Sequence, residues 1–382
     1  MQQKKTIVYI SQPTYGGVIE YLYMFLKNID KTKYNNILII SNEYKEKIER
    51  FEPYISKVYY LPMTREIKLK SVLSSIIKLK RILKKIKPDI VYMNSSMAGA
   101  VGRIALLFNT KVKTIYNAHG WYFNAKIGNK KKKMYALIEK VLALRTTKII
   151  NISQSEYNSA LKYKIAPEKK MCLIENAIDF SKFENNEQYR NRTREKYGIK
   201  ENEIVVGVVG RLSEQKDPMT SLKTFEILCK KYENLKLMYV GSGELEEEVK
   251  QYAIQKELID KIIITGWVED VEKYMSAFDI AILPSKWEGF GLVIVEYMAC
   301  KKPIVASKIG GIPNIIQTKQ NGYLAEIENA EEFAKKVEKY IKDKELVEKI
   351  VEYNYNYAKE RFDIKKLIQE HEELFKEMFD KR

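Results

Sequence analysis

The feature that most constrains the fold is a regular alternation of short β-branched runs with segments of helix length. In the first half of the chain, the runs TIVYI, NILII, DIVYM, KTIYN and KIINI alternate with helical segments that include 18–29, 71–87 and 133–144. In the second half, IVVGVVG, LKLMYVG, IIITG, DIAILP and PIVAS alternate with helical segments at 217–232, 244–256, 270–277 and 292–300. This rhythm is typical of βαβ units. It predicts an α/β chain with two doubly wound parallel sheets.

The two series are separated by the polar stretch 184–203, ENNEQYRNRTREKYGIKENE, which predicts a linker with one short helix. We therefore assign a first domain to 1–185 and a second to 200–361. The last segment, 362–379, has an amphipathic helical pattern after the second sheet is complete. We expect 362–382 to pack back on the first domain. Because ligands of such sheets bind at the carboxyl ends of the strands, we expect the two domains to face each other across a ligand cleft.

The charge of the chain is concentrated in its first half. Residues 1–185 contain 34 Lys and Arg against 14 Asp and Glu, a balance of +20. Residues 186–382 contain 33 against 36, a balance of −3. This asymmetry predicts that the first domain faces an anionic surface, either lipid head groups or nucleic acid.

Cysteine spacing and hydropathy exclude several classes of protein. The three cysteines, Cys172, Cys229 and Cys300, are far apart and show no CxxC spacing, so we expect neither disulfides nor a zinc site. No apolar run reaches the roughly 18–20 residues of a membrane span, and the first residues lack the apolar core of a signal peptide. We therefore expect a cytoplasmic protein.

One segment with chemical potential is the loop after the strand IVVGVVG. It continues from Gly210 through Arg211, Leu, Ser, Glu and Gln to Lys216, and a helix is predicted to begin near Pro218. Two cations between a strand and a helix suit a diphosphate, since arginine donates a planar fork and lysine supplies a point charge. The alternative is a solvated loop with incidental charges.

A second segment, PSKWEGFGLVIVE at 284–296, favours the binding interpretation. Its glycines let backbone N–H groups approach a phosphate, and the following helix adds the positive end of its dipole. Glu288 precedes the turn, whereas Glu296 lies in a helix that is otherwise apolar. A carboxylate there needs a partner, and sugar or ribose hydroxyls are suitable partners.

The pairing of GRLSEQKDP with EGFGLVIVE, in which two glutamates are separated by seven residues, resembles the retaining glycosyltransferases of family 4, glycosyl transferases group 1. The likeness runs over nearly the whole chain and implies the GT-B fold of two Rossmann-like domains. Further stretches resemble the family pattern, namely TYGGVIE at 14–20, NAHG at 117–120, ENAID at 175–179, GSG at 241–243 and TGWV at 265–268.

The resemblance implies a role for each matching residue. Arg211 and Lys216 would neutralise the donor diphosphate, which is the leaving group. Phe290, Gly291 and Leu292 would offer backbone donors to the phosphates or the sugar.

On the sugar side, the resemblance implies that Glu288 binds hydroxyls of the transferred sugar and that Glu296 binds the ribose. His119 would lie near the transferred sugar, and we favour a hydrogen bond over a nucleophilic role for it. The other histidine, His371, is expected to be a packed or surface residue.

Glycines complete the implied donor site. Gly16 and Gly17 form the first-strand glycine loop, in which Gly17 would let the first domain approach the diphosphate. Gly241 matches a strand end of the second domain, and the base would rest near Gly266 and Val268, mostly on backbone contacts.

We expect no metal and no other cofactor, because no Asp-x-Asp pair or ligand cluster is placed to hold a divalent ion against a diphosphate. Arg211 and Lys216 would replace it. The family retains the anomeric configuration, and no carboxylate is required as a covalent nucleophile. Front-face substitution assisted by the leaving phosphate is therefore our expectation, and a UDP-sugar is the donor that the resemblance favours.

The first domain also carries membrane-like signals. Segment 63–87 combines an apolar stripe with nine cations, among them Arg65, and includes Ile67 in the stripe. A second basic cluster, Lys126 with Lys130–Lys133, follows the aromatic residues at 121–123. We expect the stripe to pack on the sheet and the cations to meet anionic head groups. A lipid-diphosphate-linked sugar in capsule, O-antigen-like or exopolysaccharide synthesis would then be the acceptor, at the inner face of the cell membrane.

Three other interpretations remain. The same chemistry could act on a soluble polyol, thiol or sugar phosphate, and liposome binding would then be absent. A GT-B epimerase would convert the donor without an acceptor. A nucleic-acid-binding protein would explain the basic half, but not Glu288 and Glu296, and no helix-turn-helix, zinc-finger or RNP-like pattern supports it.

Overall fold

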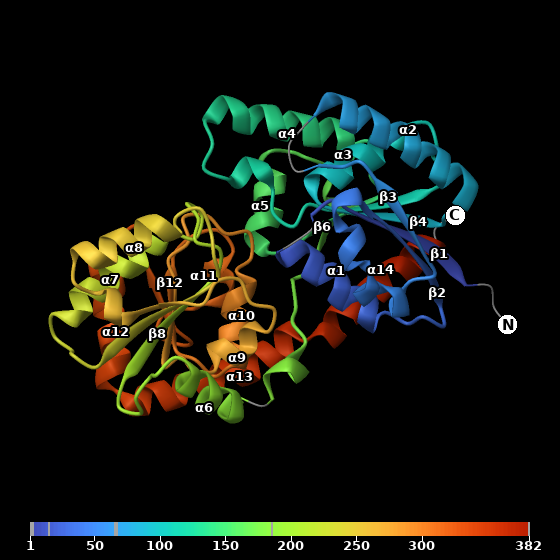
Figure 1. The fold of residues 1–382 in the computed structure, drawn as a ribbon. Coiled ribbons are helices and arrows are strands. Elements are labelled where there is room, and N and C mark those ends of the chain that lie inside the picture. Colours follow the sequence, from blue (N-terminus) through green and yellow to red (C-terminus); the bar gives the residue numbers. More distant parts are fainter. Residues whose placement is uncertain (1–3, 14–15, 65–67, 185, 381–382) are drawn as a thin grey trace. The chain divides into compact units, whose positions relative to one another are not determined.

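The computed structural model describes residues 4–13, 16–64, 68–184 and 186–380 and contains two compact units (Figure 1). The first comprises Met1–Asn176 with Ile364–Arg382, and the second comprises Ala177–Asp363. The polar stretch 184–203, where we expected the boundary, belongs to the second unit. Its helix α6 (Asn186–Lys196) is held there by Arg194, which is buried and lies 3.3 Å from the Asp279 carboxylate.

The first unit is built on a seven-stranded parallel sheet in the order β3-β2-β1-β4-β5-β6-β7. Its strands are β1 (Lys5–Ser11), β2 (Tyr34–Ser41), β3 (Lys57–Leu61), β4 (Ile90–Asn94), β5 (Lys113–Asn117), β6 (Lys148–Asn151) and β7 (Met171–Leu173). The central strands are runs of Ile, Val and Tyr that are buried on both faces, as a covered parallel sheet requires. Their register aligns Ser11, Asn94 and Asn117 at the carboxyl edge.

Helices cover both faces of this sheet. On one face, α2 (Leu69–Ile86), α3 (Ser96–Ala105) and α4 (Asn129–Ala143) lie side by side (Figure 1). On the other face, α1 (Gly17–Asn28) packs against α14 (Ile364–Asp380), the last helix of the chain. Phe375 of α14 is fully buried with its ring 6.5 Å from that of Phe25. The predicted return of the C-terminal helix to the first domain is therefore confirmed, with α14 beginning at Ile364.

Shorter elements complete the first unit. They are η1 (Asn42–Tyr54), η2 (Tyr122–Asn124), α5 (Gln154–Lys162) and η3 (Glu168–Lys170).

The apolar stripe predicted over 63–87 only partly covers the sheet. Leu79 and Leu83 of α2 are buried in the core, and Ile76 packs against it. Leu73 and Ile77, however, are exposed, so the expectation that the whole stripe packs inward was wrong. A helix on one face of a sheet can direct only about half its circumference inward. Arg65 and Ile67 lie outside the described residues.

The second unit is a six-stranded parallel sheet in the order β10-β9-β8-β11-β12-β13. Its strands are β8 (Ile204–Val209), β9 (Leu235–Val240), β10 (Ile262–Ile264), β11 (Ile280–Leu283), β12 (Ile304–Ser307) and β13 (Tyr323–Ala325). The order reverses between β8 and β11, and in doubly wound sheets ligands bind beside the carboxyl ends of the strands at such a switch point.

The helices of this unit include α7 (Pro218–Cys229), which begins at the predicted proline, and α10 (Leu292–Ala299), which follows β11. The others are η4 (Phe180–Phe183), α8 (Glu246–Gln255), η5 (Ile259–Lys261), α9 (Val271–Met275), α11 (Ile312–Ile315), α12 (Ala330–Lys342) and α13 (Lys344–Phe362). Phe362, which we assigned to the C-terminal helix, ends α13 instead. Its ring packs edge-on against that of Phe290, with centroids 5.6 Å apart.

Candidate active site

Lys216 and Glu288 meet at the switch point of the second sheet. Lys216 lies in the loop after β8 and Glu288 in the loop after β11, and the Lys216 Nζ is 2.7 Å from the Glu288 Oε2. The Ser285 hydroxyl donates to the same carboxylate oxygen at 3.3 Å. An ammonium has three N–H donors. Lys216 can therefore bind Glu288 and still donate to an anionic ligand.

Local backbone features fix the Lys216 loop. Gly210 has φ 151°, and a Cβ there would come within 3.3 Å of the Lys216 side chain. Asp217, with φ 48°, is the N-cap of α7 and accepts a hydrogen bond from the Thr220 amide at 3.3 Å. The N-cap of α7 is thus fixed at the residue that follows Lys216.

Arg211 extends from the same loop. Its Nε lies 3.1 Å from the Glu244 carboxylate, and its side chain is partly exposed. Each of the two predicted cations therefore forms an ion pair with a glutamate. Lys216 pairs with Glu288, and Arg211 pairs with Glu244. Glu244 was not singled out in the sequence.

The loop after β11 delivers a helix N-terminus to the same place. Gly291, with φ 94°, is the N-cap of α10, and no side chain among the described residues caps this helix. Its first N–H groups can therefore bind an anion, with the helix dipole adding to the attraction. Leu292 begins the helix, while Phe290 is buried and anchors the turn.

Glu296 is half-buried on the second turn of α10. The next residue, Tyr297, is fully buried, and its hydroxyl accepts a hydrogen bond from the Val209 amide at 2.7 Å. This bond fixes α10 against the end of β8, and thereby places Glu296 relative to the loop of Arg211.

Gly241 and Gly266 follow the carboxyl ends of β9 and β10. They form an isolated antiparallel bridge, and a Cβ on Gly241 would come 2.2 Å from the Gly210 carbonyl oxygen. Val268, two residues after Gly266, is half-buried. The ends of β8, β9 and β10 therefore bring Gly210, Gly241 and Gly266 together.

Gly310 and Gly311 were missed by the sequence analysis. A Cβ on Gly310 would lie 1.8 Å from the Glu288 carbonyl oxygen, and the Gly311 amide donates to that oxygen at 3.1 Å. Gly310 and Gly311 pack directly against the backbone of the Glu288 loop, so larger residues at these two positions would displace the loop. The only signal in the sequence is a paired glycine just after PIVAS.

In the first unit, the glycine loop leads into α1. Gly16, with φ 86°, is the N-cap, and Gly17 is the first helical residue. A Cβ on Gly17 would meet nothing within 4 Å, so packing inside the described part of the chain does not require a glycine there. Thr14 and Tyr15 of the same motif lie outside the described residues.

His119 lies at the carboxyl edge of the first sheet, two residues after β5, with φ 55°. Its Nε2 is 3.1 Å from the Asn94 Oδ1, so the ring donates from Nε2 and Nδ1 is the acceptor. The His119 amide donates to Asn117 Oδ1 at 2.9 Å. Burial, and to a smaller extent the nearby His371, lowers the pKa of His119 to about 3. This imidazole is therefore neutral at ordinary pH.

Beneath His119, a fully buried cluster joins α1, β4 and α14. The His371 Nδ1 lies 2.8 Å from the Leu367 carbonyl, so it donates there and Nε2 accepts. That Nε2 is 3.1 Å from the Tyr21 hydroxyl and 3.0 Å from the Tyr92 hydroxyl. His371 is thus a packed residue, as expected.

Glu156, a residue that the sequence analysis did not single out, holds the loop after His119. Its carboxylate accepts from the Trp121 amide at 2.6 Å and from the Asn124 side chain at 2.9 Å. Burial raises the pKa of Glu156 to about 7, although both hydrogen bonds lower it. The pattern Ser153-x-x-Glu156 resembles a capping box, a local signal that does not reveal a tertiary contact.

Two negative findings concern metals and membranes. Among the residues that the structure describes, no group of three or more His, Cys, Asp and Glu side chains is arranged to hold a metal ion. Over the same residues, no helix combines the length and apolar character that crossing a bilayer requires.

Comparisons with known proteins identify the family and the fold of the chain. The family model for glycosyltransferase family 4 matches residues 15–182, and that for glycosyl transferases group 1 matches 189–357. The chain thus belongs to the family 4 glycosyltransferases of group 1, and the α/β GT-B fold predicted from the sequence is confirmed.

Individual relatives are named as glycosyltransferases as well. The chain is 28% identical over 294 residues to the Escherichia coli UDP-Gal:alpha-D-GlcNAc-diphosphoundecaprenol alpha-1,3-galactosyltransferase, covering 76% of each chain. It is 29% identical over 345 residues to the capsular polysaccharide biosynthesis glycosyltransferase CapM of Staphylococcus aureus, covering 88% of this chain and 86% of CapM. The fold matches Anabaena HepE in complex with UDP and glucose with a TM-score of 0.84 at 22% identity, over 97% of this chain and 99% of HepE.

Proposed function

We propose that the protein is a retaining glycosyltransferase that moves a hexose or N-acetylhexosamine from a UDP-sugar to a membrane lipid-linked acceptor in cell-surface polysaccharide synthesis. The observation that carries the proposal is the Lys216–Glu288 pair beside the start of α10, at the switch point of the second sheet. A cation and the backbone N–H donors at a helix start suit a diphosphate, and an adjacent carboxylate suits sugar hydroxyls.

The proposed step is a substitution at the anomeric carbon. The acceptor hydroxyl oxygen forms the new bond to that carbon while the bond to the β-phosphate oxygen breaks. UDP leaves with the electron pair, and the acceptor proton passes to the leaving phosphate oxygen. Arg211 and Lys216 stabilise the charge that grows on the diphosphate. Because both bonds lie on the same face of the sugar, the configuration is retained.

The remaining residues bind the donor. Phe290, Gly291 and Leu292 direct backbone N–H groups at the phosphates or the sugar. Glu288 accepts from sugar hydroxyls and Glu296 from the ribose. The base rests along the backbone of Gly266 and Val268, beside Gly241.

In the first unit, Gly16 and Gly17 provide a loop without side chains. The open space around Gly17 supports close approach by the donor diphosphate. His119 is neutral and offers Nδ1 as an acceptor for a sugar hydroxyl. A neutral ring adds no charge to the sugar pocket, which supports a positioning role for it.

We further propose that no divalent metal and no other cofactor takes part. The two cations supply the charge that a metal would otherwise bring to the diphosphate. The test is to measure activity in the presence of EDTA.

The acceptor proposal rests on the relatives and on charge. The printed name of the Escherichia coli relative specifies a diphosphoundecaprenol acceptor, and CapM is named for capsule synthesis. A first domain with a balance of +20 suits an anionic, membrane-held acceptor. We therefore propose that the protein works at the inner face of the cell membrane, bound peripherally through this domain.

The first test is a thermal-shift screen of purified protein against UDP, GDP, ADP and several UDP-sugars with EDTA present. A selective rise in the melting temperature with UDP and one UDP-sugar supports the donor site, the base and the absence of a metal requirement. No shift with any nucleotide contradicts the donor site. Transfer to a water-soluble acceptor without any gain from a lipid-linked one would favour the soluble-acceptor alternative.

A further inference from the structure

Helix α4 turns an apolar face toward solvent. Its exposed large side chains recur with helical spacing on one side, and they are Met134, Leu137, Ile138, Val141 and the C-cap residue Leu144. Leu137 is 61% exposed and Leu144 is 81% exposed. A helix that covers a sheet normally directs its apolar face inward. The face of α4 opposite the sheet is therefore unusual and needs a partner.

A polar anchor on the opposite side fixes this orientation. The Glu139 carboxylate points inward, 2.8 Å from the guanidinium of Arg103, which is fully buried. The Tyr116 hydroxyl donates to the same carboxylate at 2.9 Å. Ala136 and Ala143 fill the rest of the inner face. With Glu139 held inside, α4 cannot rotate its apolar side chains into the core.

The neighbouring helices extend this surface. Leu69, Leu73 and Ile77 recur every four residues along α2 and are exposed. Ile104 of α3 is exposed, as are Leu107 and Phe108 of the following turn; Phe108 is 88% exposed. We call these six residues, with the five of α4, the apolar face of α2–α4. It holds eleven of the eighteen large hydrophobic side chains that are exposed in the described part of the chain, so the exposure is concentrated rather than scattered.

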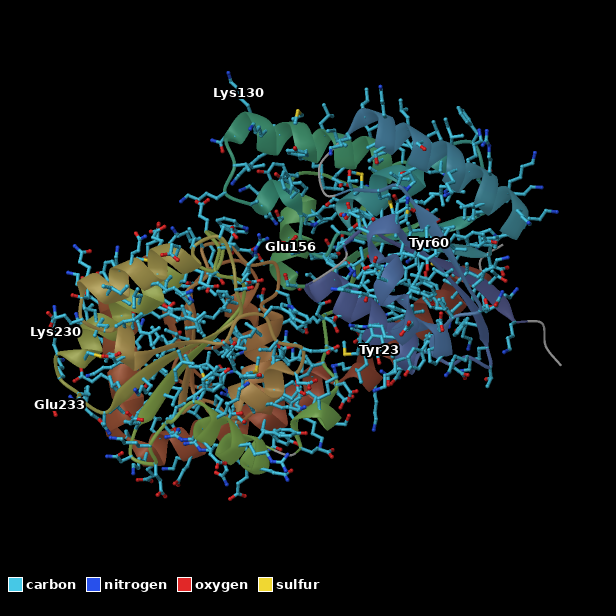
Figure 2. All side chains as sticks on the ribbon, viewed as in Figure 1. Tyr23, Tyr60, Lys130, Glu156, Lys230 and Glu233 are labelled. Atoms are coloured by element: carbon cyan, nitrogen blue, oxygen red, sulfur yellow. The ribbon has the colours of Figure 1, made fainter. Side chains whose placement is uncertain are left out.

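The charges around this face have one sign. The sequence of α2 contains six cations and no acidic residue, and that of α4 contains five cations. The one acidic residue of these two helices is Glu139, which faces inward. The Lys130 side chain extends away from the ribbon at the start of α4 (Figure 2). Apolar side chains among lysines suit a surface with an apolar interior and anionic groups at its boundary.

We propose that the apolar face of α2–α4 inserts into an anionic lipid bilayer, with its lysines at the head groups. This deepens the proposed function, because it names the surface by which the first domain would reach a membrane-held acceptor. A second copy of the chain fits less well, since it would bring two sets of eleven cations together. A bilayer containing anionic lipid neutralises those cations while it buries the apolar side chains.

The topology connects this face with the acceptor side of the first unit. β5 ends at Asn117 on the carboxyl edge, the loop of His119 follows, and α4 begins at Asn129. The start of α4, with Lys130, therefore lies at the same edge of the sheet as His119. Insertion of this face places that edge at the membrane surface, where a lipid-linked acceptor presents its sugar.

The test is co-sedimentation of the full chain with vesicles of phosphatidylglycerol and phosphatidylcholine, compared with phosphatidylcholine alone. We would use the variant Phe108→Gln/Leu137→Gln/Val141→Gln, whose side chains are exposed and whose loss should not disturb the core. The matched control is Ile254→Gln/Ile327→Gln, two exposed apolar residues of the second unit. We expect the triple variant to bind anionic vesicles at least about tenfold more weakly than the wild type and the control to bind normally.

Salt separates insertion from charge attraction. At about 0.5 M NaCl, where surface charges are strongly screened, the wild type should keep more of its vesicle binding than the triple variant. Equal binding of the triple variant and the wild type, or no wild-type binding to anionic vesicles, would overturn the proposal. A wild-type dimer that the triple substitution converts to a monomer, with vesicle binding unchanged, would show that a second copy covers this face.

Two further readouts keep this proposal distinct from the proposed function. The melting-temperature rise with UDP and the transfer to a water-soluble acceptor analogue should be the same in the triple variant and the wild type. Normal transfer with unchanged vesicle binding would reject only the membrane surface. Vesicle binding that depends on the three side chains, without transfer from any UDP-sugar, would reject only the enzymatic proposal.

Discussion

The Lys216 ammonium lies 2.7 Å from the Glu288 carboxylate, although the two residues are 72 positions apart in the chain. The contact joins the loops after β8 and β11, which are neighbouring strands on either side of the switch point. The Gly311 amide donates to the Glu288 carbonyl oxygen and so fixes the Glu288 backbone. The ion pair with Glu288 in turn limits the movement of the Lys216 side chain. The site is therefore preorganised by the fold of the second unit alone.

Replacing Lys216 tests whether this pair binds the diphosphate. Lys216→Met removes the cation and keeps the aliphatic stem, so a donor phosphate would meet the Glu288 carboxylate without its counter-charge. We expect UDP affinity to fall by about 10- to 100-fold, the usual effect of losing a hydrogen bond to a charged group. Isothermal titration with UDP measures it. Lys223→Met on the exposed side of α7 is the matched control, and equal affinities of the two variants would contradict the assignment.

Arg211 and Glu296 test the same site through activity. Arg211→Ala and Glu296→Ala should each lower the transfer rate sharply while the melting temperature stays near that of the wild type, because Arg211 is exposed and Glu296 is only half-buried. The measurement is transfer from the UDP-sugar identified by the thermal-shift screen. Arg192→Ala, an exposed arginine on α6, should retain full activity. Wild-type rates in the first two variants would count against the proposed site.

The sequence indicated the residues of this site unevenly. Arg211, Lys216, Glu288 and Glu296 lie in two short motifs, where residue type indicated ligand binding and the resemblance to family 4 implied a role for each residue. Glu244 and Tyr297 could not be found in this way, because their partners are distant in the chain or on the backbone of another element.

Glu156 should make the stability of the first unit depend on pH. Its pKa is raised to about 7 in the folded protein, so the folded state holds a proton that the unfolded state releases near its usual, lower pKa. Stability therefore falls as the pH rises from about 4.5 to about 7 and then levels off. Glu156→Gln removes this term and can still accept from the Trp121 amide.

Unfolding by urea at several pH values compares the variant with the wild type. We expect the free energy of unfolding of Glu156→Gln, relative to that of the wild type, to increase as the pH rises from 4.5 to 7. Glu168→Gln, in η3 outside this cluster, is the control and should show no such gain. A constant difference between Glu156→Gln and the wild type would mean that Glu156 does not titrate in this range.

His371 should act in the opposite direction. Burial lowers its pKa to about 4, so below about pH 6.5 the unfolded state takes up a proton that the folded state refuses. Its contribution to stability is complete above pH 6.5 and is lost as the pH falls toward 4, by up to about 1.4 kcal/mol per pH unit. His371→Gln should therefore be less stable than the wild type at pH 7, by a margin that shrinks on acidification. A margin that stays constant between pH 7 and pH 4 would contradict this pKa.

The fold was predictable wherever an element carries its own pattern. The central strands and α7 followed from hydrophobic runs and a helix-start proline. Helix α3 was not predicted, because its sequence contains two glycines that weaken a helix signal. Both are required by packing: a Cβ on Gly99 would lie 2.3 Å from the Tyr116 ring, and one on Gly102 would lie 2.4 Å from the Met93 sulfur. The short strands β7 and β13 gave too few residues for a period-two pattern.

The orientation of α4 likewise depends on a contact that the sequence does not show, the buried pair of Arg103 and Glu139. Arg103→Met leaves the Glu139 carboxylate largely buried without its counter-charge, and losing one partner of such a pair typically costs about 3–5 kcal/mol. We expect the single variant to unfold at clearly lower urea concentration than the wild type.

The double variant Arg103→Met/Glu139→Leu provides the decisive comparison. With both charges gone, the inner face of α4 becomes apolar, and stability should recover most of what the single variant loses. The double variant also tests what sets the outer face of α4. Without the buried pair, α4 has apolar side chains on both sides, so nothing polar fixes which side faces the core. The double variant should therefore bind anionic vesicles more weakly than the wild type at high salt, although its folded fraction is similar. Full vesicle binding would show that the pair stabilises the helix without setting the face that it exposes.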